Sequence, residues 1–191
     1  MILSPDNARS RWQPLAGGSW LFQGERFCDA RGTSDEICGF EHWPASLEPF
    51  VVAQENVVTT HRAGCARGLH YQVEPYAQAK VVTVLRGSAQ FFWVPLDNDL
   101  PSARVHSIIL TDNAASLYTP ATCAHGMLAV ADETQFLLKM SMPVSLKHRG
   151  EVNFGAKSLF IDLTHPLRED LLSPRDRSAS QWKVRRRSIA R

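Results

Sequence analysis

The sequence lacks the features that mark several large classes of protein. Its four cysteines form no CxxC pair, so we expect neither disulfides nor a structural zinc site. No basic stretch followed by a long apolar run opens the chain, because Pro5, Asp6 and Asn7 interrupt it early. We therefore expect no signal peptide, no membrane partner and a cytoplasmic location. A glycine-rich phosphate loop and internal repeats are also missing, and 44% hydrophobic with 21% charged residues is typical of a globular protein.

Positive charge gathers near the C-terminal end, although the formal net charge is only +2. The cluster consists of Lys183, Arg185, Arg186, Arg187 and Arg191. Such a run can attract nucleic acid or an acidic membrane, but no aromatic side chain lies between these arginines to stack on bases. We therefore expect residues 179–191 to form a basic, flexible tail without a nucleic-acid partner, and residues 1–178 to form a single domain.

Short apolar runs of strand length follow one another from residue 50 onward. Gly, Pro, Asn and Asp separate them, which is typical of an antiparallel sandwich or barrel and predicts an all-β fold. The runs are Phe50–Ala53, Lys80–Leu85, Ala89–Leu96, Val105–Leu110, Leu117–Thr119, Met127–Val130 and Phe136–Met142. Residues 1 to about 50 are expected to form an arm with short strands. Later in the chain, Phe160, Ile161 and Leu163 would form a last strand, and Leu167–Leu172 a short helix.

The segment KVVTVLRGSAQFFWVPL, residues 80–96, predicts a hairpin. Two β-prone runs flank a short loop whose Gly87 can adopt a positive φ. Strand alternation puts Lys80, Val82 and Val84 on one face and Val81 on the other. Lys80 then either points into the interior or, as a lysine at a strand end, reaches out to water.

Two histidines are candidates for proton transfer. His70 lies in RGLHYQ at residues 67–72, and His125 lies in ATCAHGM. Taken alone, a histidine fits a core or surface position better than the role of a general base. Arg67 precedes His70 by three positions, which puts it on the opposite face of a regular strand. Arg31, Arg67 and Lys80 are the types of side chain that pair with phosphate oxygens.

Six motifs, in order and spacing, carry a resemblance to a known family. They are DARGTSDE, QEN at 54–56, ARGLHYQ, PYAQAKVVTVLRG, YTPATCAHGM and LLSPRD. Over residues 25–178 the chain resembles the dTDP-4-dehydrorhamnose 3,5-epimerases, which are cupin-like jelly rolls. The resemblance implies a jelly-roll barrel with an N-terminal arm and a short C-terminal helical segment. It also implies a homodimer that exchanges its N-terminal strand, a nucleotide-sugar substrate, and no metal or organic cofactor. Cupin metal sites usually use two histidines separated by one residue. Here the position of the second histidine, after His70 and Tyr71, is Gln72, so iron and zinc are disfavoured.

The resemblance assigns roles to particular residues. His70 would be the general base that removes a proton next to the ketone, Asp176 would orient it, and Lys80 would stabilise the enolate oxygen. Arg67 and His125 would line the same pocket. The positions that match the family's nucleotide-contacting residues are Arg31, Glu36, Gln54 and Asn56.

The segment FLLKMSMPVS departs from the family pattern. The family carries a tyrosine before the lysine, where this chain has Leu138, and a second tyrosine near Met142–Val144. The usual proton donor is therefore missing. Three hypotheses follow: an epimerase or isomerase of a nucleotide-linked 4-keto-6-deoxy sugar, a repurposed member that isomerises or cyclises a non-sugar carbonyl compound, and a non-catalytic ligand-binding homologue.

Overall fold

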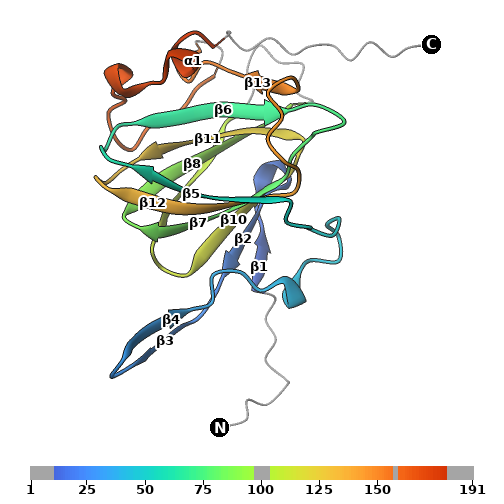
Figure 1. Cartoon of the computed structure of the whole chain (residues 1–191), viewed down its shortest axis with the longest axis vertical. Helices are drawn as coiled ribbons and strands as arrows, with labels where there is room; N and C mark the ends of the chain where they lie inside the picture. The colour runs from blue at the N-terminus through green and yellow to red at the C-terminus, as the bar shows by residue number, and fades with distance from the viewer. Residues whose placement is uncertain (1–10, 97–103, 157–158, 180–191) are drawn as a thin grey trace, which may run out of the picture.

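Two antiparallel sheets, packed face to face, form the body of the protein (Figure 1). This computed structural model describes residues 11–96, 104–156 and 159–179. The first sheet has the order β1 (Trp12–Pro14), β2 (Trp20–Gln23), β10 (Ala115–Thr119), β7 (Lys80–Arg86), β12 (Thr134–Met140) and β5 (Gln54–Thr60). The second has the order β13 (Arg149–Glu151), β6 (Ala66–Gln72), β11 (Cys123–Ala129), β8 (Ser88–Pro95) and β9 (His106–Thr111). The all-β prediction is confirmed.

Short elements complete the described chain. β3 (Arg26–Asp29) and β4 (Gly32–Asp35) pair as a separate hairpin. Three 3-10 turns span Ala16–Gly18, Phe40–His42 and Glu169–Leu171, and α1 spans Pro174–Arg177. No helix in the described ranges is long and apolar enough to cross a bilayer.

The two sheets enclose an apolar core to which both contribute. Its buried members include Val82, Val84 and Leu117 from the first sheet and Phe91, Trp93 and Met127 from the second. Val81 packs on the other face of the first sheet, with Trp12 and Phe22 of the N-terminal arm. The predicted alternation along β7 is thus confirmed, and it places Lys80 on the inner face, two residues before Val82.

A second apolar cluster covers the outer face of the second sheet. Leu69 and Phe92 of that sheet pack there against Phe154 and Leu159, which follow β13. Each such fully buried side chain contributes roughly 1.5–3 kcal/mol relative to its exposed form. This cluster fixes the C-terminal segment across the sheet and so determines where α1 lies.

The predicted hairpin over residues 80–96 is wrong in its pairing. Gly87 does adopt φ +82°, but β7 pairs with β10 and β12, whereas β8 pairs with β11 and β9. The turn at Gly87 therefore carries the chain from one sheet to the other. Both strands are buried on both faces, so their sequence gives no hint of which neighbours they have.

Two predicted strands are displaced or absent. Residues 50–53 are not a strand, because the strand begins at Gln54 and the ring of Phe50 packs against Trp43 and Tyr118. Residues 160–163 are not a strand either. Instead of pairing with a sheet, this segment packs Ile161 and Leu163 on the second apolar cluster. The helix expected at 167–172 is reduced to the 3-10 turn at Glu169–Leu171, followed by α1.

The N-terminal arm was predicted correctly in outline. β1 and β2 extend the first sheet, while the β3–β4 hairpin projects away from the body of the molecule (Figure 1). Phe27 on this hairpin is 56% exposed. The expectation of a flexible basic tail concerns residues 179–191, of which 180–191 lie outside the described residues.

Candidate active site

Polar side chains replace apolar ones at one end of the space between the sheets. β7 brings Lys80, β12 brings Leu138, and β5 brings Gln54 and Asn56, whose register partners are Met140 and Leu138. Leu138 packs on the core between the sheets, so its neighbours in register share that inner face. On the second sheet, His70 and His125 are paired in register. We call Gln54, Asn56, His70, Lys80 and His125 the polar end.

His70 forms a short hydrogen bond with Asp176. Its Nε2 lies 2.6 Å from Asp176 Oδ1, and the two residues are 106 positions apart in the sequence. Although burial raises the pKa of Asp176, the bonds from His70 and Ser173 and the charge of Arg149 lower it overall. An ionised carboxylate only accepts, so His70 Nε2 carries the hydrogen and Nδ1 is left as the basic nitrogen.

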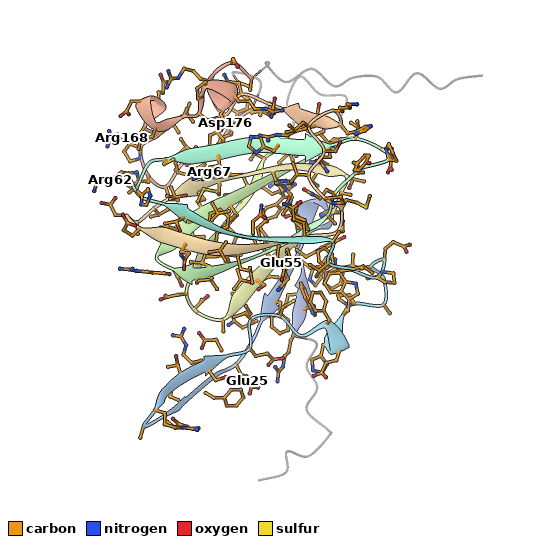
Figure 2. The ribbon with its side chains drawn as sticks, viewed as in Figure 1. Glu25, Glu55, Arg62, Arg67, Arg168 and Asp176 are labelled. Carbon is orange, nitrogen blue, oxygen red and sulfur yellow. The ribbon has the colours of Figure 1, made fainter. Side chains whose placement is uncertain are left out.

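Local chemistry at the start of α1 places Asp176. Ser173 is the N-cap residue: its Oγ accepts from the Asp176 backbone N–H at 3.0 Å and donates to Asp176 Oδ2 at 2.9 Å. Pro174 at the first helical position suits this geometry. The carboxylate is thereby held from one side by Ser173 and from the other by His70. Figure 2 shows it beside β6.

Lys80 is a cation in an unfavourable environment. Burial, and to a smaller extent the nearby charge of Arg149, lower its pKa from 10.5 to about 7. An ammonium at this place gains much from a negative charge that develops beside it. Lys80 therefore suits stabilisation of an enolate oxygen.

His125 is held neutral. Burial, followed by the charges of Lys80 and His70, lowers its pKa well below the ordinary value. Both ring nitrogens are buried, and neither makes a hydrogen bond of ordinary geometry with another described residue. His125 is paired in register with His70, and the charge of Lys80 acts on it from the facing sheet, so the three side chains belong to one region of the interior.

Arg149 belongs to this region and was missed in the sequence. Its Nη2 lies 3.3 Å from His70 Nε2, and its Nε lies 3.0 Å from Glu151 Oε1. Glu151 also pairs with Arg175 of α1. Arg149 comes from β13, a strand of three residues without an apolar pattern, so periodicity could not reveal it.

Two candidate residues lie elsewhere. Arg31 is at the tip of the β3–β4 hairpin, where its side chain is 91% exposed and pairs with Asp29. Glu36 pairs with Arg11, and its backbone N–H donates to Glu25. Figure 2 shows Glu25 at the end of the molecule opposite Asp176. Within one chain, Arg31 and Glu36 are therefore not brought to the polar end.

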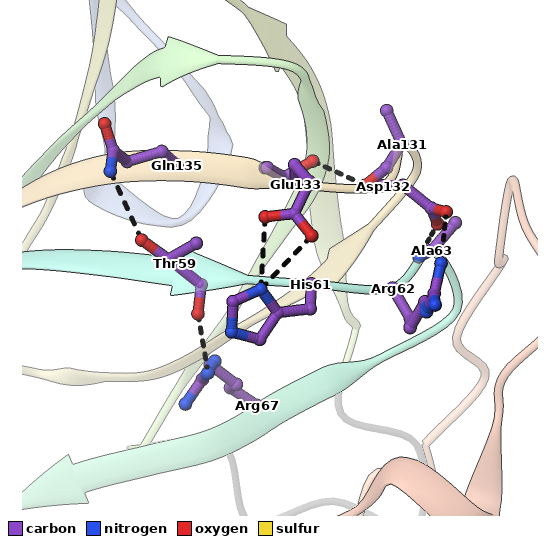
Figure 3. A network of polar contacts seen from close by, with 10 residues as sticks. Thr59, His61, Arg62, Ala63, Arg67, Ala131, Asp132, Glu133 and Gln135 are labelled. Atoms are coloured by element: carbon purple, nitrogen blue, oxygen red, sulfur yellow. Dashed lines mark hydrogen bonds and ion pairs between the residues drawn. The ribbon is translucent and has the colours of Figure 1, made fainter.

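Arg67 lies on β6 three residues before His70. Its Nε donates to Thr60 Oγ1 at 3.2 Å. Its Nη2 donates to the Thr59 carbonyl, also at 3.2 Å (Figure 3). The pairing register of β6 with β11 shifts between His125 and Met127. On β6 itself, Ala66 and Leu69 pack in the same apolar cluster although they are three positions apart. The regular alternation that put Arg67 and His70 on opposite faces is therefore wrong for β6.

The loop that follows β12 is held beside the polar end by hydrogen bonds from its backbone to side chains of β5 and β6. Gln54 Oε1 accepts from the Val144 backbone N–H at 3.0 Å, and Gln54 Nε2 donates to Asn56 Oδ1 at 3.1 Å. Gln72, next on the inner side of β6, accepts from the Ser145 backbone N–H at 2.6 Å. Across the described ranges, no three His, Cys, Asp or Glu side chains gather in a way that would hold a metal ion.

Comparison with known proteins decides the family. Residues 15–183 match the family described as dTDP-4-dehydrorhamnose 3,5-epimerase. The chain belongs to this family. The enzyme of that name from Shigella flexneri is 32% identical over 158 residues, which cover 82% of this chain and 86% of the relative. The one from Sinorhizobium fredii is 30% identical over 132 residues, 67% of each chain.

Solved structures of epimerases share the fold. The dTDP-4-dehydrorhamnose 3,5-epimerase of Bacillus anthracis, with TDP and PPi bound, has a TM-score of 0.77 at 28% identity over 86% of this chain and 94% of its own. A 3'-monoepimerase from Streptomyces bikiniensis, in complex with dTDP-quinovose, has a TM-score of 0.79 at 27% identity over 87% of this chain and 85% of its own. The expected cupin-like jelly roll is thereby confirmed.

Proposed function

We propose that this protein epimerises a dTDP-linked 4-keto-6-deoxy sugar at a carbon next to the ketone. Membership of the epimerase family supports the reaction class. The single observation that carries the proposal is the 2.6 Å bond between His70 and Asp176 at the inner face of β6. A base with an ionised partner is what abstraction of a weakly acidic carbon-bound proton requires.

His70 is the general base in this proposal. Asp176 accepts from Nε2, so Nδ1 takes the proton from carbon and the resulting imidazolium is stabilised by the carboxylate. The electron pair of the C–H bond passes to the ketone oxygen as the enolate forms. Lys80, on the facing sheet, stabilises that oxygen by its positive charge.

Substrate binding involves the rest of the polar end and a second subunit. The sugar or nucleotide contacts His125, Gln54 and Asn56 of the polar end and the neighbouring Leu138. The diphosphate contacts Arg67. Arg31 and Glu36 contact the nucleotide held by a partner in a homodimer. The projecting β3–β4 hairpin, with its exposed Phe27, supports that arrangement, because Arg31 is remote from its own polar end.

A second candidate function is base-promoted isomerisation or cyclisation of a non-sugar carbonyl compound. The observation in its favour is the apolar side chain of Leu138 at the inner face, next to Met140, the register partner of Lys80. An apolar lining suits a less polar ligand. The His70 base and Lys80 would act in it as described above.

Solvent exchange tests the proposed function. Wild-type protein in D2O should introduce deuterium next to the ketone of dTDP-4-keto-6-deoxyglucose, as followed by NMR. His70→Ala should slow this by about 10²–10⁴-fold, the usual contribution of a general base. His61→Ala is the matched control, because His61 is 76% exposed and pairs with Glu133 (Figure 3). Exchange without a loss in His70→Ala would refute the role of the base. Absence of exchange in wild type would favour the non-sugar substrate if dTDP does not bind, and a non-catalytic homologue if it does.

A further inference from the structure

The first sheet faces His70 across the interior, and its inward side chains at this end are mostly unable to ionise. Among the described residues they are Gln54, Asn56, Lys80, Thr119, Leu138 and Met140. Of these, Lys80 alone carries a proton that dissociates near neutral pH. His70 and its register neighbour His125 both lie on the other sheet. A flat enolate bound between the sheets thus has histidines on one side and Lys80 on the other.

We propose that Lys80 delivers the proton that inverts the carbon, from the face opposite His70, in addition to stabilising the enolate oxygen. This inference rests on the proposed epimerisation and names the donor for it. Inversion requires that the proton leave from one face and arrive on the other, so the base and the donor must approach from two sides. The two facing sheets supply them from β6 and β7.

The step is balanced in atoms and charge. His70 Nδ1 takes the proton from carbon, and the enolate forms. On collapse, a new C–H bond forms with a proton from the Lys80 ammonium, the N–H electron pair stays on nitrogen, and the ketone is restored. His70 is then an imidazolium and Lys80 an amine. His70 releases a proton to solvent and Lys80 takes one from it.

The surroundings of Lys80 favour proton transfer over a permanent ion pair. Among the described residues, no carboxylate forms a salt bridge with its Nζ, whereas Lys139, one position from its register partner, pairs with Glu55. Burial and Arg149 lower the pKa of Lys80 to about 7, so the ammonium gives up its proton readily. Leu138, where the family is expected to carry a tyrosine, offers no competing hydroxyl.

Lys80→Arg separates the two roles. A guanidinium keeps the positive charge but does not release a proton in proteins. With dTDP-4-keto-6-deoxyglucose in D2O, we expect the variant to exchange deuterium with retention within about tenfold of the wild-type rate, while formation of the inverted product falls by at least about 100-fold. Lys139→Arg, the matched control on the other face of β12, should change neither rate.

The outcomes are distinct. If wild type neither exchanges nor inverts, the proposed epimerisation fails. If wild type inverts and the ratio of inversion to deuterium exchange is unchanged in Lys80→Arg, the role of Lys80 as donor is overturned. The same holds if Lys80→Arg loses both reactions while it still binds dTDP.

Should Lys80→Arg not fold, Lys80→Ala with added amines gives the same decision. Methylammonium should restore inversion, whereas tetramethylammonium, which has a charge but no proton, should not. Equal rescue by both cations overturns the proposal.

Discussion

At the scale of single residues, Asp176 is a positioning residue in the proposed mechanism: it holds the His70 ring by a 2.6 Å bond and stabilises the imidazolium that forms, without touching the substrate. Asp176→Asn keeps the size of the side chain but removes the charge that stabilises the imidazolium. We expect kcat to fall about 10²–10⁴-fold, with little change in KM. Steady-state kinetics would check this, with Asp170→Asn as the control, since Asp170 is 61% exposed and pairs with Arg168. An equal loss in both variants would argue against the dyad.

Lys80 gives the enzyme a pH dependence of defined sign. Its pKa is about 7, lowered by burial and Arg149, and His125 nearby is neutral. In the proposed mechanism the charged form of Lys80 acts on the enolate, so kcat/KM should fall as pH rises through about 7. In Lys80→Arg, the rate of deuterium exchange, corrected for the amount of substrate bound, should no longer fall as pH rises through about 7. A limb that is unchanged in the variant would assign it to another group.

The same lowered pKa affects stability. The unfolded chain keeps Lys80 protonated up to its ordinary pKa of 10.5, whereas the folded chain releases the proton from about pH 7. The unfolded state binds more protons in this window, so stability rises with pH across it. Lys80→Met should therefore be more stable than wild type at pH 6.5, with the difference in Tm shrinking toward pH 9.5. Thermal unfolding followed by circular dichroism would measure both proteins.

At the scale of elements, the turn at Gly87 is one of the connections between the two sheets. A Cβ there would lie 2.8 Å from Thr134 Oγ1, at a φ of +82°. Gly87→Ala should lower the free energy of unfolding by about 1–3 kcal/mol. Urea unfolding would show it, with Gly155→Ala as the control, because Gly155 has no positive φ and its Cβ would meet the Asn153 side chain at 3.2 Å. A neutral Gly87→Ala would mean that the turn relaxes.

The strands could be predicted from the sequence better than their partners. The apolar runs located β7, β8, β9 and β12 within a few residues. They could not show that β7 and β8 lie in different sheets, because strands buried on both faces carry no mark of their neighbours. β5 was displaced because QENVVTT is polar at its start. For the site, the pairing of Asp176 with His70 came only from the resemblance, and Arg149 depends on tertiary contacts that no local pattern encodes.

At the scale of the whole molecule, the proposed homodimer makes each site depend on two chains. Arg31→Ala and His70→Ala homodimers should both have low activity, since each lacks one part of both sites. A heterodimer of the two variants contains one site with His70 from one chain and Arg31 from the other. We expect mixing under exchanging conditions to recover activity, measured by deuterium exchange. Absence of recovery in a verified heterodimer would place Arg31 outside the partner's site.

The long separation between His70 and Asp176 also sets an order of events during synthesis. Every described strand of both sheets precedes Asp176 in the chain. On the ribosome, which works from the N-terminus, His70 is therefore synthesised well before its partner carboxylate. The strands of both sheets exist in the growing chain before the partner of the proposed base does. The His70–Asp176 bond forms only when the segment after β13 has been translated and has docked.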